Sequence, residues 1–434
     1  MNDVRPDRWP VRTRRLLVII LIVVFSVLAV RTVLDIWMGR RLNDEIARLE
    51  TQYGPLRWDP VRKRNPWRGW PRWLSPENRA RMIDAAAARV VLSDANRELI
   101  YLPRTATTLT ADQARAVADE NRDAVQLAIR ASRLQHSNWW VAYLAEPDGV
   151  PNLGNLHYLS TVLAIAARSD TDAGRTDDAV ADVTAGFAQS AAMLAEPVAI
   201  MSVNAMSVVR EQMDALSDIL ARAEPSGPAL ASLAVAIDEN LPASPMREVM
   251  LGDLKHSVFV WPWIERGYFD GRRDPRTPSW WTRAATSAAA RLVRPVIRFM
   301  AERNLSDKAG AVDAASMPRN RRAAPFQTSG RARSEVGALI DLGDDWTASV
   351  GLAADAVALR RFRLDHGAYP TTLDELVPTY LKAVPLNPYS GRQPEYVRQG
   401  AGFELHARVP PIPVPPGSIT IPGRTSPWDW KVPR

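Results

Sequence analysis

The sequence predicts a mainly α-helical protein with an N-terminal transmembrane helix, an α-helical array and a small α+β module with a short antiparallel sheet at the C-terminus. Three observations lead to this fold class. A charge-free apolar run lies near the N-terminus, apolar residues recur at helical spacing through the middle, and turn and capping signals cluster near the end. Strand-like alternation is nearly absent before that cluster.

The composition limits the function classes. A chain of 434 residues has room for two or three domains, and 46% hydrophobic with 24% charged residues excludes wholesale disorder. The net charge of +7 suits anionic lipid headgroups or nucleic acid. Cysteine is absent, which excludes disulfides, thiol nucleophiles and Cys-ligated zinc.

The N-terminal segment sets the topology. Residues 16–30 read LLVIILIVVFSVLAV, and residues 16–38 reach the roughly 20 apolar residues that a bilayer core requires. Arg31 and Asp35 are four residues apart and can pair on one helix face. Several arginines in the tail, residues 1–15, predict a cytoplasmic N-terminus and an exported remainder; they are Arg5, Arg8, Arg12, Arg14 and Arg15.

A cleaved signal peptide is the alternative interpretation of this segment, because the strongly apolar run is short. The sequence SVLAVRTVLD that follows offers no good small-residue cleavage site, which favours an uncleaved anchor.

Residues 39–74 form a juxtamembrane segment in two parts. RLNDEIARLETQYG has apolar residues at helical spacing and is expected to continue the membrane helix outward. WDPVRKRNPWRGWPRWLSPEN carries Trp among Arg, Lys and Pro. It forms either a collar in the headgroup zone or an irregular linker whose Trp residues pack on the main domain.

Residues 75–263 are expected to form the helical array. Ser75 and Pro76 give a helix start signal, and Thr110 caps a helix through residues 110–134. Two further helices surround the turn TDAGR, and the pair from Leu156 to Pro197 resembles a tetratricopeptide-type hairpin through Ala179, Val183 and Phe187. An ordinary antiparallel helix pair is the alternative.

Residues 264–335 are basic, with fifteen Lys and Arg against seven Asp and Glu. SWWTRAATSAAARLVRPVIRFMAERN has the composition of an interfacial helix, and AASMPRNRRAAPFQTSGRARSE is turn-rich and predicts a loop. An anionic membrane is a candidate partner for this region, with a solvated loop as the alternative. Nucleic acid is disfavoured because no recognisable binding module accompanies the charge.

No catalytic constellation is visible. The five His lack metal-ligand spacing, and no hydrolase elbow, phosphate loop or dinucleotide fingerprint occurs. The carboxylate pairs at 177–178 and 344–345 are interpreted as residues at helix starts. Glu248 and Asp253 precede His256 at spacings that can place them on one side of a helix, although surface charge explains them as well. We therefore assign no catalytic, cofactor-binding or metal-binding residue and no cofactor.

Residues 336–407 are predicted to form the C-terminal module. A long helix ends at Gly367 in a left-handed cap, and Thr372 with Glu375 matches a capping box for a short second helix. Leu373, Leu376 and Val377 give that helix its buried face. LNPYSG predicts a turn, and PEYVR and GFELHA predict two short strands.

This ordered string is similar to the C-terminal half of type II secretion pseudopilins. The matching residues are Gly367, Tyr369, Pro370, Leu373, Leu376, Val377, Leu381, Pro385, Pro388, Gly391 and Tyr396. The N-terminus lacks the family's processed motif, and Asn387 stands where major pseudopilins have a calcium-coordinating Asp. The whole layout also resembles a group of uncharacterised bacterial single-pass membrane proteins, a resemblance that implies an architecture and no activity.

Residues 408–434 are Pro-rich and predict an extended, solvated tail. The leading functional hypothesis is a non-enzymatic, membrane-anchored envelope protein that acts as a scaffold or interaction protein. One alternative is an accessory component of a type II secretion or pilus-like system. The other is an envelope hydrolase whose site combines dispersed His and carboxylates, with His157, Glu248, Asp253 and His256 as the residues to test.

Overall fold

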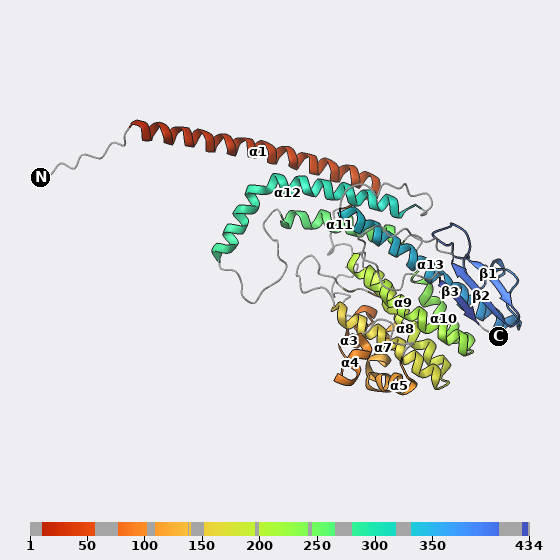
Figure 1. Ribbon diagram of the computed structural model, residues 1–434. Coiled ribbons are helices and arrows are strands. Elements are labelled where there is room, and N and C mark those ends of the chain that lie inside the picture. Colours follow the sequence, from red (N-terminus) through yellow and green to blue (C-terminus); the bar gives the residue numbers. More distant parts are fainter. Residues whose placement is uncertain are drawn as a thin grey trace. The chain divides into compact units, whose positions relative to one another are not determined.

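The computed structural model confirms the predicted fold class: the chain is mainly helical, with an apolar N-terminal helix and a small antiparallel sheet near the C-terminus (Figure 1). The chain divides into two compact units, residues 1–58 with 254–308, and residues 59–253 with 309–434. The structure describes residues 11–56, 77–101, 109–137, 139, 152–195, 199–241, 245–264, 280–317, 331–407 and 428–432.

The first unit is built around α1 (Val11–Tyr53), a single helix of 43 residues. At 1.5 Å per residue it is about 65 Å long, roughly twice the thickness of a bilayer core. Its apolar side chains from Leu16 to Trp37 are exposed, whereas Leu42, Ile46 and Leu49 are buried. Among the described residues it is the one helix that is long and apolar enough to cross a membrane. The prediction that the helix continues past residue 38 is confirmed, because α1 extends without interruption to Tyr53.

Two more helices contribute to this unit. Residues 254–264 belong to α11 (Pro245–Ile264), and residues 280–308 belong to α12 (Trp280–Ala315). Lys308 of α12 donates a 2.7 Å hydrogen bond to the Ser257 hydroxyl of α11. Helix α12 contains Pro295 and is visibly bent in Figure 1. A proline inside a helix removes one backbone hydrogen bond and is the usual cause of such a bend.

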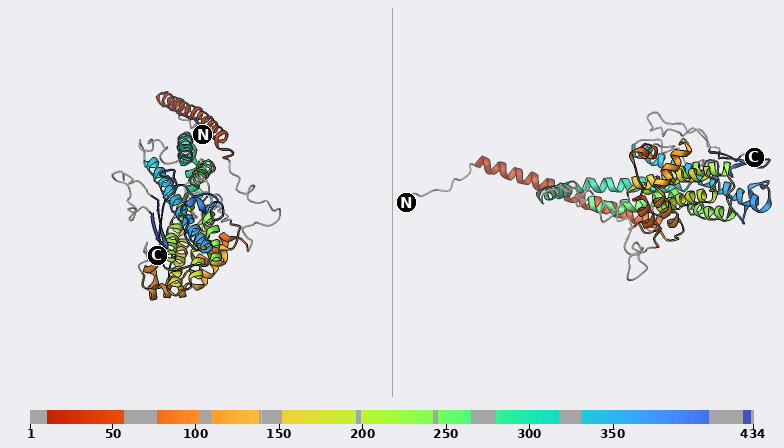
Figure 2. Two further views of the ribbon diagram at one scale, coloured as in Figure 1. Left: turned by 90° about the vertical axis from the view of Figure 1, so that its right-hand side faces the viewer. Right: turned by 90° about the horizontal axis from the view of Figure 1, so that it is seen from below.

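The second unit contains the helical array (Figure 1, orange to green). Its central helices α7, α8 and α9 pack against one another, and α10 packs on α8. Figure 2 shows these helices from two further directions. The helices are α3 (Arg79–Ala87), α4 (Asp94–Tyr101), α5 (Ala111–Glu120), α6 (Arg122–Ser132), α7 (Leu153–Asp172), α8 (Thr176–Leu194), α9 (Ala199–Arg222) and α10 (Gly227–Asp238).

Some helix boundaries differ from the prediction. Helix α3 begins at Arg79 and is capped by Asn78, so the start signal at residues 75–76, which lie outside the described residues, does not begin it. Thr110 does cap α5, as predicted, with a capping box completed by Gln113. The helix predicted through residues 110–134 is broken at Asn121, because that side chain accepts a 2.7 Å hydrogen bond from the backbone of Val91.

Buried amide side chains join the central helices. Gln189 of α8 donates to the Leu156 carbonyl of α7 at 2.7 Å, and Gln212 of α9 donates to the Ser160 carbonyl of α7 at 3.0 Å. Asn240 donates to the Phe187 carbonyl of α8 at 2.9 Å. Because a buried amide without a partner costs about 1–3 kcal/mol, these bonds fix the positions of the helices along one another.

Helix α13 (Arg331–His366) is longer than predicted. Residues 331–335, expected in a loop, are helical, while residues 318–330 lie outside the described part of the chain. Asp344 and Asp345 therefore lie in the middle of α13, and their interpretation as residues at a helix start is wrong. The interpretation is correct for Asp177 and Asp178, which lie in the first turn of α8.

The sheet packs against α13 and contains one strand more than predicted. β1 (Glu395–Gln399) and β2 (Gly402–Ala407) form the expected antiparallel pair. β3 (Trp428–Val432) pairs with the other edge of β2, so the prediction of a solvated tail is wrong for these five residues. On β2, Phe403, Leu405 and Ala407 are buried, which is the alternation expected for one covered face.

The connection from α13 to the sheet agrees with most of the predicted signals. Gly367 has a φ of 75°, which confirms the left-handed helix end. The Glu375 carboxylate accepts hydrogen bonds from the backbone of Thr371 and Thr372, but the following helix is a single 3₁₀ turn, η5 (Leu373–Leu376). Its two leucines are buried, whereas Val377, predicted to be buried, is 37% exposed.

Candidate functional site

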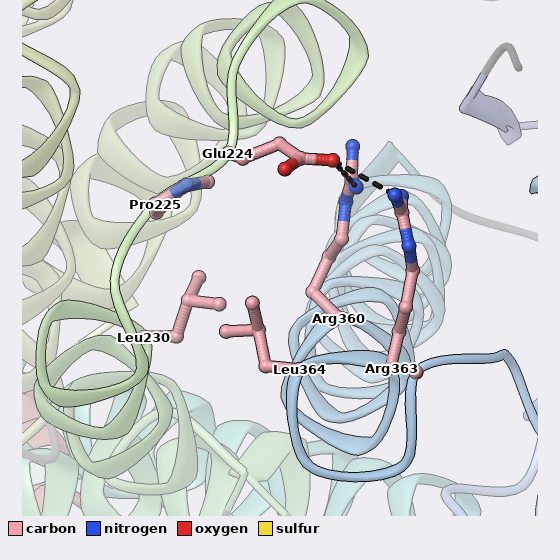
Figure 3. Close-up of a pocket in the computed structure, with 7 residues that line it drawn as sticks. Glu224, Pro225, Leu230, Arg360, Arg363 and Leu364 are labelled. Carbon is pink, nitrogen blue, oxygen red and sulfur yellow. Dashed lines mark hydrogen bonds and ion pairs between the residues drawn. The ribbon is translucent and has the colours of Figure 1, made fainter.

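A pocket lies in the second unit where the C-terminal ends of α9 and α13 meet the start of α10 (Figure 3). Glu224 and Pro225 come from the α9–α10 connection, and Leu230 comes from α10. The remaining lining residues come from the end of α13; they are Arg360, Arg363, Leu364 and Gly367. None of the residues named in the hydrolase hypothesis lines this pocket.

Arg360 occupies the inner part of the pocket. Its guanidinium donates to the backbone carbonyl of Leu220, in the last turn of α9. The last carbonyls of a helix have no intrahelical donor, and a cation also matches the negative end of the helix dipole. The side chain is only 7% exposed, and burial lowers the pKa of Arg360. Its Nε atom is buried and has no hydrogen-bond partner among the described residues.

Arg363 lies one turn further along α13, and both Arg360 and Arg363 face the Glu224 carboxylate. Its guanidinium lies 2.8 Å from Glu224 Oε1, and Arg360 lies 4.0 Å from the same oxygen. Figure 3 shows both guanidinium groups directed toward this carboxylate. A hydrogen bond to the Tyr369 hydroxyl is the main cause of the raised pKa of Arg363. Two cations therefore share one carboxylate that is 66% exposed.

The pocket has a volume of about 240 Å³. This is several times the roughly 30 Å³ that one water molecule occupies, but below the roughly 300–1,000 Å³ of pockets that enclose whole small molecules. Its polar lining comprises the two guanidinium groups and the Glu224 carboxylate, and Leu230, Leu364 and Pro225 supply apolar contacts. Chemically, the arrangement can hold one carboxylate or a similar small anion together with an apolar neighbour.

A second polar cluster joins α7 and α9. His157 Nδ1 lies 3.4 Å from Glu211 Oε1, and the Thr161 hydroxyl donates to Glu211 Oε2 at 3.3 Å. Burial raises the pKa of Glu211 to about 7, and burial lowers the pKa of His157. The pair can hold a proton near neutral pH. Thr161 of α7 also donates a hydrogen bond to Glu211 of α9. The cluster therefore has a structural role as well, because it links two packed helices.

Of the other residues of the hydrolase hypothesis, Glu248 has a partner outside this cluster. Glu248 is exposed and pairs with Arg247 at 2.7 Å. Asp253 is half-buried on the same helix, α11, and the His256 side chain lies outside the described residues. Sequence reasoning named His157 but missed Glu211, the carboxylate that faces it.

The remaining His residues have local roles. His366 stacks on Phe362 with ring centroids 4.1 Å apart, at the end of α13. His406 on β2 lies 3.4 Å from Glu404 on the same strand. The backbone carbonyl of His136 accepts a 2.7 Å hydrogen bond from Arg79. Among the described residues, no group of three or more His, Asp or Glu side chains could hold a metal ion.

Asn387, the residue at the pseudopilin calcium position, has a turn-forming role. Its side-chain oxygen accepts a 2.9 Å hydrogen bond from the Tyr389 backbone, and its carbonyl accepts one from Gly391 at 2.8 Å. Asn387 is buried. Its amide therefore holds the predicted LNPYSG turn together.

The sequence contains a signal for the arginine pocket that composition alone does not reveal. The string LRRFRLDHG places three arginines just before the end of a helix, where cations match the helix dipole. Two of them line the pocket, and the third, Arg361, lies over the Tyr380 ring at 5.4 Å. The sequence does not show that the end of α9 lies opposite.

No family model, curated protein or solved structure matches the chain. The resemblance of the C-terminal module to pseudopilins stays a prediction.

Proposed function

We propose that this protein is a non-enzymatic interaction protein, anchored by α1 in a bacterial inner membrane, whose exported helical domain binds acidic groups of an envelope partner. The observation that carries the proposal is the pair Arg360 and Arg363, which share one exposed carboxylate in a pocket too small for most substrates. The N-terminal arginines support a cytoplasmic N-terminus.

The Glu224 carboxylate acts as an internal stand-in for the partner's acidic group. An ion pair of an exposed carboxylate is worth only about 0–1 kcal/mol, so an incoming carboxylate can displace it at low cost. Replacement of the Glu224 carboxylate by the partner's carboxylate is favoured because Arg360 is already desolvated and Arg363 keeps its contact with Tyr369. The apolar lining then gives preference to an acidic side chain beside an apolar one.

Binding of peptides to the full-length protein in nanodiscs tests the proposal. The probes are short peptides rich in Asp and Glu, and the controls are the same peptides with Asn and Gln. An ion pair at an exposed site contributes up to about 1 kcal/mol, so Arg363→Ala should weaken binding by up to about fivefold. Arg361→Ala is the matched control, because Arg361 is the neighbouring arginine on α13 and lies over Tyr380.

Equal binding of the acidic and amide peptides, or equal losses in the two arginine variants, would refute the proposed binding role. The proposed topology has a separate test. A reporter fused to the C-terminus should be active only outside the cytoplasm, and cytoplasmic activity would contradict the exported domain.

The two alternatives remain distinguishable. A secretion-system accessory predicts co-purification with such components after gentle crosslinking in cells. The hydrolase alternative gains no support from geometry, because His157 pairs with Glu211 while Glu248 pairs with Arg247.

A further inference from the structure

We infer that α12 is a second membrane-contacting element, clamped to the outer end of the anchor so that its apolar stripe enters the headgroup boundary of the bilayer. The inference rests on α1 spanning the membrane. It adds to the proposed function a lipid contact made by a helix some 250 residues away in the sequence.

Charged side chains join α1 to α12 within the first unit, and we call the contacts between them the clamp. Arg298 lies 3.2 Å from the Asp35 carboxylate and donates a 2.7 Å hydrogen bond to the Asp35 backbone carbonyl. Arg294 lies 3.8 Å from the same carboxylate. One turn and a half further along, Arg41 lies 2.6 Å from Glu302. The Asp35 carboxylate thus pairs with arginines of α12 and not with Arg31, which is the partner that the sequence suggested.

Arg31 has a different contact on the same helix. Its guanidinium donates to the backbone carbonyl of Arg291. That carbonyl would normally accept from the residue four positions later, which is Pro295 and has no N–H. Arg31 therefore satisfies the carbonyl that the proline leaves open, at the level where α12 begins to run beside α1.

Gly39 of α1 lies at the contact with Arg298. A Cβ atom at this position would lie 2.5 Å from the Arg298 guanidinium, so that group lies directly on the α1 backbone. The order of the contacts, with Arg31 beside Arg291 and Arg41 beside Glu302, shows that the two helices run in the same direction.

The clamp leaves one face of α12 exposed and apolar. Ile297, Ala301 and Leu305 are buried on the opposite side. The exposed stripe has helical spacing, and its side chains are 44–63% exposed; they are Leu292, Val293, Val296, Phe299 and Met300. It is long enough to make a continuous apolar surface, which is unusual on a water-facing helix.

The position of the stripe relative to the bilayer indicates that it contacts lipid. The predicted span of α1, residues 16–38, ends about two turns beyond Arg31, so Arg31 and its partner Arg291 lie near the outer end of the acyl core, from which Arg31 can reach the headgroups. The described part of the stripe, Leu292 to Met300, lies between the contacts at Arg291 and Glu302. It is therefore level with residues 31–41 of α1, where Leu34 and Trp37 are also exposed. The exposed side chain of Arg291 can then contact anionic headgroups.

Site-directed labelling tests this inference directly, because the chain has no native cysteine. The full-length protein with Val296→Cys carries an environment-sensitive fluorophore in vesicles of phosphatidylethanolamine and phosphatidylglycerol. We expect blue-shifted emission that is quenched by brominated acyl chains and protected from iodide. Ser306→Cys, at an exposed position on the same helix, is the matched control and should show the opposite pattern.

A third label, at Leu28→Cys in α1, distinguishes the claim that α1 spans the membrane from the claim that α12 contacts lipid. Lipid quenching at position 28 with iodide quenching at position 296 would overturn the inference while leaving the anchor intact. Loss of lipid quenching at both positions would instead contradict the anchor. Protection of position 296 that disappears on dilution of the protein in the bilayer would assign the stripe to a second copy and also overturn the inference.

The clamp has its own test in the same system. Asp35→Ala should reduce lipid quenching at position 296 severalfold without changing it at position 28, and Asp35→Glu should restore part of it. Asp44→Ala, at an exposed acid on the same helix, is the control. Unchanged quenching in Asp35→Ala would show that the ion pairs do not position α12.

Discussion

Arg298 of α12 contacts Asp35 of α1 in two ways, because it lies 3.2 Å from the Asp35 carboxylate as an ion pair and donates a 2.7 Å hydrogen bond to the Asp35 backbone carbonyl. Both side chains are mostly buried, at 15% and 21% exposure. Unlike a surface pair, this contact is shielded from solvent, and removing one partner leaves a desolvated charge behind. The stability of the anchor region therefore depends on it.

A double-mutant cycle measures this dependence. Asp35→Asn and Arg298→Met should each lower the stability of the detergent-solubilised protein, and the double variant should lose less than their sum. Because the two charged groups are mostly buried and form an ion pair, a coupling of about 1–3 kcal/mol is expected in denaturant unfolding. Arg303→Met, at an exposed position of the same helix, is the control, and additive losses for Asp35 and Arg298 would contradict the pairing.

Glu211 predicts a pH dependence of stability. Its pKa is about 7 in the folded protein, above the ordinary 4.5, so the folded state holds a proton that the unfolded state releases between these values. Stability is therefore greatest below about pH 4.5 for this group and falls as pH rises toward 7, by up to about 3 kcal/mol.

Glu211→Gln should flatten that fall in thermal unfolding between pH 5 and 7, because the amide cannot ionise. Glu248→Gln, at an exposed position beside Arg247, should keep the wild-type slope. An unchanged slope in Glu211→Gln would show that this carboxyl group does not titrate in the range.

Asp355 predicts a stabilising substitution. It is fully buried on α13, neither carboxylate oxygen has a partner among the described residues, and burial raises the pKa of Asp355 well above its usual value. Asp355→Leu removes the cost of burying an unpaired polar group, about 1–3 kcal/mol, and should raise the Tm. Asp345→Leu on the same helix should lower the Tm, because Asp345 accepts a hydrogen bond from Tyr389. Destabilisation by both variants would contradict this account.

Substitution of Gly367 should lower stability through the backbone conformation, without the loss of any side-chain contact. No atom lies within 4 Å of a Cβ placed there, but its φ of 75° is costly for other residues. Gly367→Ala should destabilise the protein by about 1 kcal/mol. Gly227→Ala in the first turn of α10 also meets no atom and should be neutral or slightly stabilising in the same unfolding assay.

Local signals explain what the sequence predicted well. The anchor, the Thr110 cap, the end of α13 at Gly367 and the β1–β2 hairpin all depend on residues within a few positions of one another. Apolar spacing was less informative near helix ends. Leu364 is an apolar residue near the end of α13, yet it is 47% exposed and lines the arginine pocket.

Long-range contacts explain what the sequence did not predict. Arg360 contacts Leu220 across 140 positions, and Arg298 contacts Asp35 across 263. Residues 331–335 have a loop-like composition but continue a helix whose later turns are buried. β3 lies beyond a Pro-rich stretch, and its pairing depends on the open edge of β2.

The most direct measurement of the central claim is the affinity of an acidic peptide for the Glu224→Gln variant in nanodiscs. Removal of the internal carboxylate leaves Arg360 and Arg363 without their shared partner. If the pocket binds acidic groups, affinity should rise roughly two- to fivefold, since the displaced ion pair is worth about 0.5–1 kcal/mol. The amide peptide should gain nothing. An acidic peptide that binds Glu224→Gln no better than the wild-type protein, or no better than its amide counterpart, would contradict the proposed function.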